Sequence, residues 1–191
     1  ELKTTTGGTS AAKMTIAANG TVTLASPSLS NLAVNLQTAV ATTSGTSIDF
    51  TGIPAGVKRI TVIYNGLSTN GTSVFLAQLG DSGGFETSGY TGRAVRNGPT
   101  NNIYSSAFGA GFLLSDSIAA ANVYIGSIKL EHIGSEEWIA SGSQNTLTAI
   151  NEASQFNGAK TLSGVITQFR LTTVNGTDTF DAGLVNISWE F

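Results

Sequence analysis

Six Asn-Gly pairs divide this chain of 191 residues, and they constrain its fold more than any other feature. Gly, and to a lesser degree Asn, accept the positive φ angles of tight two-residue turns, so Asn-Gly between apolar runs indicates a β-hairpin. The pairs begin at Asn19, Asn65, Asn70, Asn97, Asn157 and Asn175. This pattern predicts many short strands joined by tight turns rather than a bundle of helices.

The composition agrees with strands. Ser and Thr supply 47 residues and Gly 23, whereas Lys and Arg together supply only 9. Exposed helix faces usually need Lys, Glu and Arg, so this balance favours β-structure. Cysteine is absent, which excludes disulfides, thiol nucleophiles and cysteine metal sites. The net charge is −3 and the basic residues form no stripe, so we expect no nucleic-acid partner. No apolar run is long enough to span a bilayer, so we expect no membrane insertion.

Strand-like runs lie between the turns, with apolar and polar residues alternating. In the run 122–134, alternation places Ile125, Ser127 and Lys129 on one face and Ile128 and Leu130 on the other. The other expected strands cover 46–50, 58–65, 73–80, 105–115, 136–143, 164–174 and 183–191. Because no βαβ spacing occurs, about eight to ten such strands predict an all-β fold, an antiparallel, jelly-roll-like β-sandwich. We expect its core to contain Phe50, Phe75, Phe112, Tyr124, Phe169 and Trp189.

The first residues do not carry enough large apolar groups for a core of their own. We therefore predict a β-stalk and neck at 1–37 and a sandwich head domain at 38–191. Ser26-Pro27 begins a helix candidate with coiled-coil spacing, in which Leu29, Leu32 and Leu36 form the neck of a homotrimer. The alternative is a Ser-rich linker with an ordinary turn of helix. Since the first residue is not Met, we expect a processed product or a piece of a longer chain.

The segment GTSIDFTGIPAGVKRITVIYNGLSTNGTSVFLAQLGDSGGFETSGY (45–90) resembles a module of tail-fibre and other structural proteins of tailed bacteriophages. TQFRLTTVNGTDTFDAGLVNISWEF (167–191) is similar to the closing hairpin of that module, and KMTIAANGTVTL (13–24) is similar to shaft segments that precede it. The resemblance implies a protein that is made in the host cytoplasm and carried on the virion as a homotrimer. It also implies attachment to a host surface glycan or outer-membrane component. Alternatives are a head-fibre, decoration or tail-joint protein that contacts other virion proteins, and a glycan- or ester-hydrolysing spike.

The string GDSGG at 80–84 matches the surroundings of a protease serine, so Ser82 needs a separate test. The single histidine, His132, lies downstream of Ser82, which reverses the order found in chymotrypsin-like proteases. The residues after Ser82 have no helical period, as an α/β-hydrolase elbow would require. Glu136 and Glu137 are adjacent on an expected strand, so their carboxylates point to opposite faces. We therefore predict a glycine-rich turn and no catalytic residue.

The sequence predicts no metal site and no cofactor. His132 has no second His or Cys with which to bind a transition metal. Asp178 and Asp181 lack the spacing of an EF-hand calcium loop.

Two segments rich in aromatic, amide and guanidinium groups are the receptor-binding candidates. Aromatic faces bury the weakly polar C–H surfaces of sugars, while amides pair with hydroxyl groups. Asn and Gly also populate β-loops for backbone reasons alone, which is the competing interpretation. The candidates are Tyr90, Arg93, Arg96, Asn101, Asn102, Tyr104, Gln144, Asn151, Gln155 and Phe156.

Overall fold

The computed structural model describes residues 2–6, 9–16, 18–20, 22–24, 34–98, 103–107, 109–120, 122–148 and 152–191. Every regular element within those ranges is a β-strand, which confirms the all-β prediction. No helix long and apolar enough to cross a lipid bilayer occurs in this part of the chain.

Two antiparallel sheets form the body of the protein. The large sheet has nine strands, ordered β11 (Ile103–Ser106), β10 (Thr91–Asn97), β15 (Ala153–Thr161), β14 (Glu137–Thr146), β13 (Tyr124–Gly134), β7 (Arg59–Thr69), β17 (Phe180–Glu190) and β4 (Asn35–Leu36), with β5 (Val40–Ala41) also pairing with β17. The small sheet contains β12 (Phe112–Leu113), β8 (Phe75–Asp81), β16 (Gln168–Thr173) and β6 (Ser47–Thr51), with β9 (Gly84–Phe85) beside β8.

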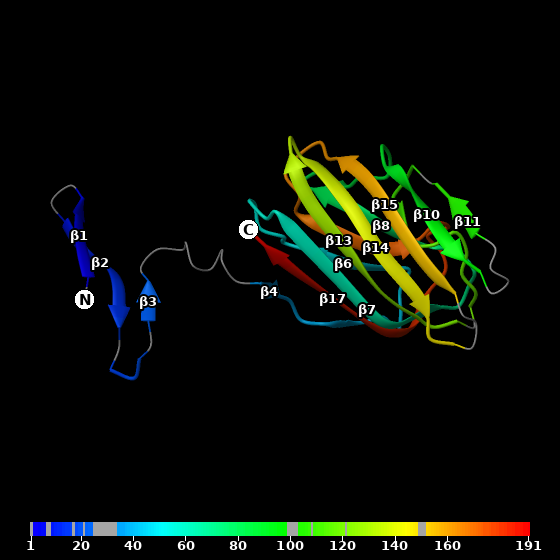
Figure 1. The fold of residues 1–191 in the computed structure, drawn as a ribbon, viewed down its shortest axis with the longest axis horizontal. Helices are drawn as coiled ribbons and strands as arrows, with labels where there is room; N and C mark the ends of the chain where they lie inside the picture. The colour runs from blue at the N-terminus through cyan, green and yellow to red at the C-terminus, as the bar shows by residue number, and fades with distance from the viewer. Residues whose placement is uncertain are drawn as a thin grey trace.

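The chain passes repeatedly between the two sheets, as in a sandwich with crossing connections. β6 and β8 lie in the small sheet, whereas β7 between them in sequence lies in the large one. β16 and β17 are likewise divided between the sheets. In Figure 1 the strands β13, β14 and β15 pass in front of β8, so the two layers face each other. The antiparallel β-sandwich is therefore the predicted fold.

The core fills the space between the sheets. All six aromatic residues assigned to the core from the sequence are buried, with exposures of 0–8 %. Phe75 is central, because its ring meets Tyr124 edge-on at 5.5 Å and lies stacked with Phe180 at 6.2 Å between centroids. Such pairs add to the free energy gained from burying the rings. Residues 125–133 alternate as predicted: Ile128 and Leu130 are fully buried, while Lys129 between them is exposed.

Glycines in the large sheet make room for two of these rings. Gly126 and Gly142 lie at positions where a side chain would point toward the core. A Cβ atom at Gly126 would overlap the hydroxyl of Tyr64, and one at Gly142 would overlap the ring of Phe156. Rings that lie across strand glycines shield the backbone and hold the strands in register.

Four of the six Asn-Gly pairs lie at turns, bends or strand ends, as predicted, and the prediction was wrong for the two that lie inside strands. Asn19-Gly20 does lie at the turn between β2 (Thr9–Ile16) and β3 (Val22–Leu24). Asn65-Gly66 lies inside β7, opposite a bulge in β17, where Gly66 and Gly183 come too close for side chains. Asn157-Gly158 lies inside β15. Glycine is needed there for close backbone approach rather than for a turn.

The N-terminal strands form a separate, three-stranded sheet, ordered β1 (Leu2–Thr6), β2 and β3. Leu29 and Leu32 of the predicted neck lie outside the described residues. Leu36 is not helical as predicted; it lies in β4 and pairs with Ser188 of β17. The sheet edge explains the difference, because it offers backbone partners such as the Ile187 carbonyl, which accepts from the Gln37 N–H at 2.9 Å. Pairing with the head thus begins before residue 38.

Replacing Gly142 by Ala should destabilise the protein by about 2 kcal/mol, because the added methyl group has no space beside Phe156. Urea unfolding followed by tryptophan fluorescence measures this change. The matched control is Gly109→Ala, where a Cβ atom would have only ordinary contact, with the Tyr90 carbonyl at 3.9 Å. Equal effects of the two substitutions would contradict the packing described for Gly142.

Candidate functional site

Three of the predicted receptor-binding side chains belong to the core, which corrects that part of the prediction. Tyr90, Gln144 and Phe156 are only 5 %, 2 % and 2 % exposed. The Tyr90 hydroxyl accepts from the Leu79 N–H at 2.7 Å, and Gln144 accepts from the buried Tyr64 hydroxyl at 3.0 Å. The prediction grouped residues by type, whereas the side of the strand on which each residue lies decides what it touches.

Arg96 is also turned inward. Its Nε donates to Asp116 at 2.6 Å and its Nη1 to Glu152 at 2.5 Å, with all three side chains 11–14 % exposed. These contacts tie β10 to the loop after β12 and to the connection between β14 and β15. Arg96 therefore stabilises the fold through two ion pairs between separate segments of the chain. Nothing in the local sequence indicated its two partners, because both are distant along the chain.

Four other candidates cannot be placed as side chains. Asn101, Asn102 and Asn151 lie outside the described residues, and only the backbone of Tyr104 is described, in β11. Their part in receptor binding stays a prediction.

Arg93 and Gln155 are the two candidates that the structure brings together. Both lie on the outer face, which is the side of the large sheet turned away from the small sheet. Gln155 pairs with Val95 and Arg93 with Asn157, so the two side chains occupy neighbouring rows on adjacent strands. Both are exposed.

The register places the outer-face side chains in rows that cross the strands. One row, called here the basic row, runs from β7 to β10 through Thr61, Lys129, Ser141, Asn157 and Arg93. The next row, called here the amide row, runs from β17 to β10 through Asn186, Ile63, Ser127, Ser143, Gln155 and Val95. Hydroxyl and amide groups therefore dominate the centre of the face.

A shallow depression lies at the centre of these two rows. It has a volume of about 380 Å³ and is lined by Ser127, Lys129, Ser141, Gly142, Ser143, Gln155, Phe156 and Asn157. Ser141 and Ser143 lie on the central strand β14, and longer side chains come from the strands on either side, Lys129 from β13 and Gln155 and Asn157 from β15. The hollow thus follows from side-chain length along β13, β14 and β15. The three serines and Asn157 were not among the residues predicted from the sequence, although the alternation of residues 125–133 placed Ser127 on the exposed face.

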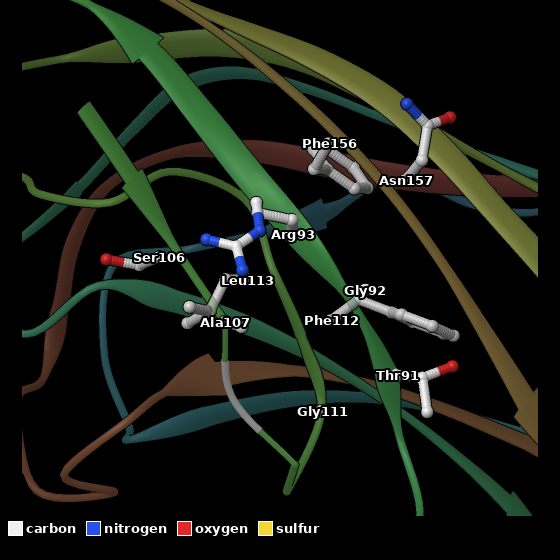
Figure 2. A pocket seen from close by; sticks show the side chains of 10 residues that line it. All are labelled: Thr91, Gly92, Arg93, Ser106, Ala107, Gly111, Phe112, Leu113, Phe156 and Asn157. Atoms are coloured by element: carbon white, nitrogen blue, oxygen red, sulfur yellow. The ribbon is translucent and has the colours of Figure 1, made fainter. Parts of the chain in front are cut away.

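A second hollow near Arg93 is too small to bind a ligand. Figure 2 shows its lining residues, with Phe156 and Asn157 leaving β15 in different directions. Its volume is about 10 Å³, which is room for about one water molecule. The depression on the outer face is therefore the better candidate for binding.

The charges on the outer face are unevenly distributed. Lys129 is half exposed, and its Nζ lies 3.7 Å from Glu131 in the row beyond it. Arg59 also contacts Glu131, at 3.3 Å, and Glu190, at 3.2 Å. Carboxylates thus gather at one end of the face, beside Arg59, and the basic and amide rows contain none.

The GDSGG segment forms a turn between β8 and β9, as predicted. Ser82 is exposed at its tip. The buried carboxylate of Asp81 accepts from the Ser163 hydroxyl and from the Gly83 N–H, each at 2.7 Å. His132 lies elsewhere in the fold: its ring stacks on Trp138 at 5.0 Å, and its Nδ1 lies 3.3 Å from Lys58 Nζ. Ser82 and His132, the single histidine, therefore do not form the pair that a catalytic triad needs.

A polar cluster surrounds Asp81 at this end of the sandwich. The hydrogen bond from Ser163, and next that from Gly83, lower the pKa of Asp81. Burial alone would raise the pKa of Glu86, but hydrogen bonds from Lys160 and Ser163 outweigh it and leave that pKa lowered. Lys160 is 6 % exposed and forms an ion pair with Glu86. The cluster joins the β8–β9 turn to the end of β15.

In the described ranges, no three metal-ligating side chains come together. The carboxylate of Asp178 accepts instead from the Ser73 N–H at 2.8 Å and from the Asn175 amide at 2.6 Å.

No protein-family model matches this chain, and no curated protein is similar to it. Among solved structures, scytalido-glutamic peptidase with a peptide-based transition-state analogue is 14 % identical over 75 % of this chain and 74 % of that one, with a TM-score of 0.27. A protein of unknown function from Shewanella oneidensis MR-1 is 11 % identical over 82 % and 74 %, with a TM-score of 0.32. These likenesses are too low to carry an argument about function.

Stability should fall in acid because of the Asp81 cluster. A carboxyl group whose pKa is lower in the folded state contributes stability above its unfolded pKa and loses it as the pH falls. The ordinary values are 3.8 for Asp81 and 4.5 for Glu86, so we expect a decline from about pH 5 downward. Urea unfolding at stepped pH measures it. Asp81→Asn should flatten the decline, whereas the exposed Asp181→Asn should keep it; equal slopes for Asp81→Asn and the unmodified chain would count against the cluster.

Proposed function

We propose that this chain is a non-enzymatic virion protein of a tailed bacteriophage, in which the sandwich is the distal, receptor-binding part of a tail fibre. It is made in the host cytoplasm, assembles as a homotrimer and attaches to a surface glycan or outer-membrane component of the host. The sequence resemblance at 45–90 and 167–191 supports this assignment, together with the form of the outer face.

The depression on the outer face is the observation that carries the proposal. Ser127, Ser141 and Ser143 offer hydroxyl groups, and Gln155 and Asn157 offer amides, which donate to and accept from sugar hydroxyls. The depression is shallow and open along the sheet, which suits one side of a polysaccharide better than a buried small molecule. A single contact of this kind is weak. Three heads on one fibre, and several fibres on one particle, would convert weak contacts into firm attachment.

The surroundings of the candidate catalytic groups support binding rather than catalysis. Asp81, beside Ser82, is engaged by Ser163 and Gly83, and His132 is engaged by Trp138 and Lys58. Glu136 lies in the turn between β13 and β14 with a φ of 57°, and Glu137 begins β14. A hydrolytic spike is therefore the weakest of the three alternatives.

Filling the depression should abolish attachment. Ser143→Trp places a large side chain over the middle of the hollow and, because residue 143 is exposed, should leave the fold intact. We expect fluorescently labelled protein to bind whole host cells and the variant to bind at least about tenfold more weakly.

The control is Thr51→Trp, an exposed position on β6 of the small sheet, which should bind like the unmodified chain. Receptor-deficient cells should bind none of the three proteins. Undiminished binding by Ser143→Trp would exclude the depression as the site, and failure of the unmodified chain to bind any host cell would argue against the function.

A second candidate function is structural, as a head-fibre, decoration or tail-joint protein that contacts other virion proteins. Exposed apolar side chains on adjacent strands favour it. Leu36 on β4, Leu184 on β17 and Ile63 on β7 are 69 %, 52 % and 56 % exposed. They lie in three successive rows of the large sheet, and exposed apolar side chains on one face commonly mark protein contacts. The same residues could serve the proposed homotrimer. Ile63 faces Ser127 in the amide row, so such a contact would border the depression and leave it open.

A charge placed in this apolar group should weaken self-association. Ile63→Lys is expected to shift a trimer toward monomer at micromolar concentration, because a buried lysine without a partner is costly. Sedimentation velocity measures the distribution. Val174→Lys, at an exposed apolar residue after β16, is the control and should assemble normally. A monomeric unmodified chain at the same concentration would rule out the homotrimer.

A further inference from the structure

We infer that the ligand of the outer-face depression is an acidic saccharide, which lies along the basic row with anionic groups beside Lys129 and Arg93. This inference rests on the proposed attachment function and adds the chemical class of the receptor. It comes from the order of side chains in that row, in which two cations flank a pair of neutral, hydrogen-bonding residues.

Within the basic row, Lys129 and Arg93 lie on either side of the neutral, hydrogen-bonding residues Ser141 and Asn157. Lys129 on β13 faces Ser141 on β14, Ser141 faces Asn157 on β15, and Asn157 faces Arg93 on β10. Three steps between neighbouring strands separate the two cations by about 14 Å. That span fits a few linked sugar rings. The middle rings would pair with Ser141 and Asn157, and acidic rings would reach the two cations.

The basic and amide rows, as far as the structure describes them, contain no carboxylate that would repel such a ligand. Three other cations form ion pairs within the fold: Arg96 contacts Asp116 and Glu152, Lys160 contacts Glu86, and Arg170 contacts Asp49. Lys129 instead has a loose 3.7 Å contact with Glu131, which is itself shared with Arg59.

A ligand carboxylate would gain more from Lys129 than Glu131 does. Exposed ion pairs at such distances contribute little, because water screens them and both side chains must be ordered. A ligand held by serine hydroxyls and amides is already positioned, so its charge-assisted hydrogen bonds to Lys129 and Arg93 cost less ordering. The neutral residues between them therefore make the two cations effective.

The test uses the intact chain and oligosaccharides of known charge. Isothermal titration calorimetry compares oligogalacturonate and alginate oligomers with the carboxyl-reduced, neutral form of each. We expect at least one acidic oligomer to bind about tenfold more tightly than its reduced form, and that advantage to shrink as NaCl is raised. Lys129→Gln and Arg93→Gln should each weaken binding of the acidic form about fivefold to tenfold, with no change for the reduced form.

Lys58→Gln is the matched control, because Lys58 is an exposed cation beside His132 and off the basic row. It should bind like the unmodified chain. If the reduced oligomers bind as tightly as the acidic ones, or if neither binds, the inference is wrong. The proposed function is tested separately by whole-cell binding: cells bound equally well by the Lys129→Gln and Arg93→Gln variants would leave attachment standing without an acidic receptor.

Discussion

The alternation of side chains along β13, β14 and β15 is the constraint on which the rest of the structure depends. Each of these strands presents one set of residues to the core and the other to solvent. On the inner side, Gly126 and Gly142 leave space for the rings of Tyr64 and Phe156. On the outer side, Ser127, Ser141 and Ser143 leave the space that becomes the depression. Small residues therefore leave space on both faces of these strands. On the inner face aromatic rings fill that space, and on the outer face it stays open to solvent.

Much of the fold could be predicted because periodicity and composition act locally. The all-β class, the two-sheet arrangement, the faces of residues 125–133 and the six core aromatic residues all follow from patterns that need no knowledge of distant contacts. The turns could not be assigned as reliably. Asn65-Gly66 and Asn157-Gly158 have the letters of a hairpin, but the chain uses their glycines where strands or rings approach closely. That requirement arises only once the sheet has formed.

The candidate site was predicted only in part, because it too depends on contacts that arise only once the sheet has formed. Arg93 and Gln155 were chosen for their chemistry, and they lie on the exposed face. Tyr90, Gln144 and Phe156 were chosen for the same chemistry but point into the core. Asn157 and the serines, which line the depression, come from three strands that meet through register. A row of this kind has no signature within any single segment, since its members are far apart in the sequence.

The position of β17 has a consequence for how the protein is made. This last strand pairs with β7, from the first half of the chain, along almost its whole length, and its other edge holds β4 and β5. The edge of the large sheet formed by β7, β17, β4 and β5 therefore stays incomplete until β17 has been synthesised. Contacts between such distant segments form slowly, and an unpaired strand edge invites association with other chains in the meantime. Until β17 pairs with it, one edge of β7 has no partner strand within the described sheet, and a second copy that meets it then can pair there instead.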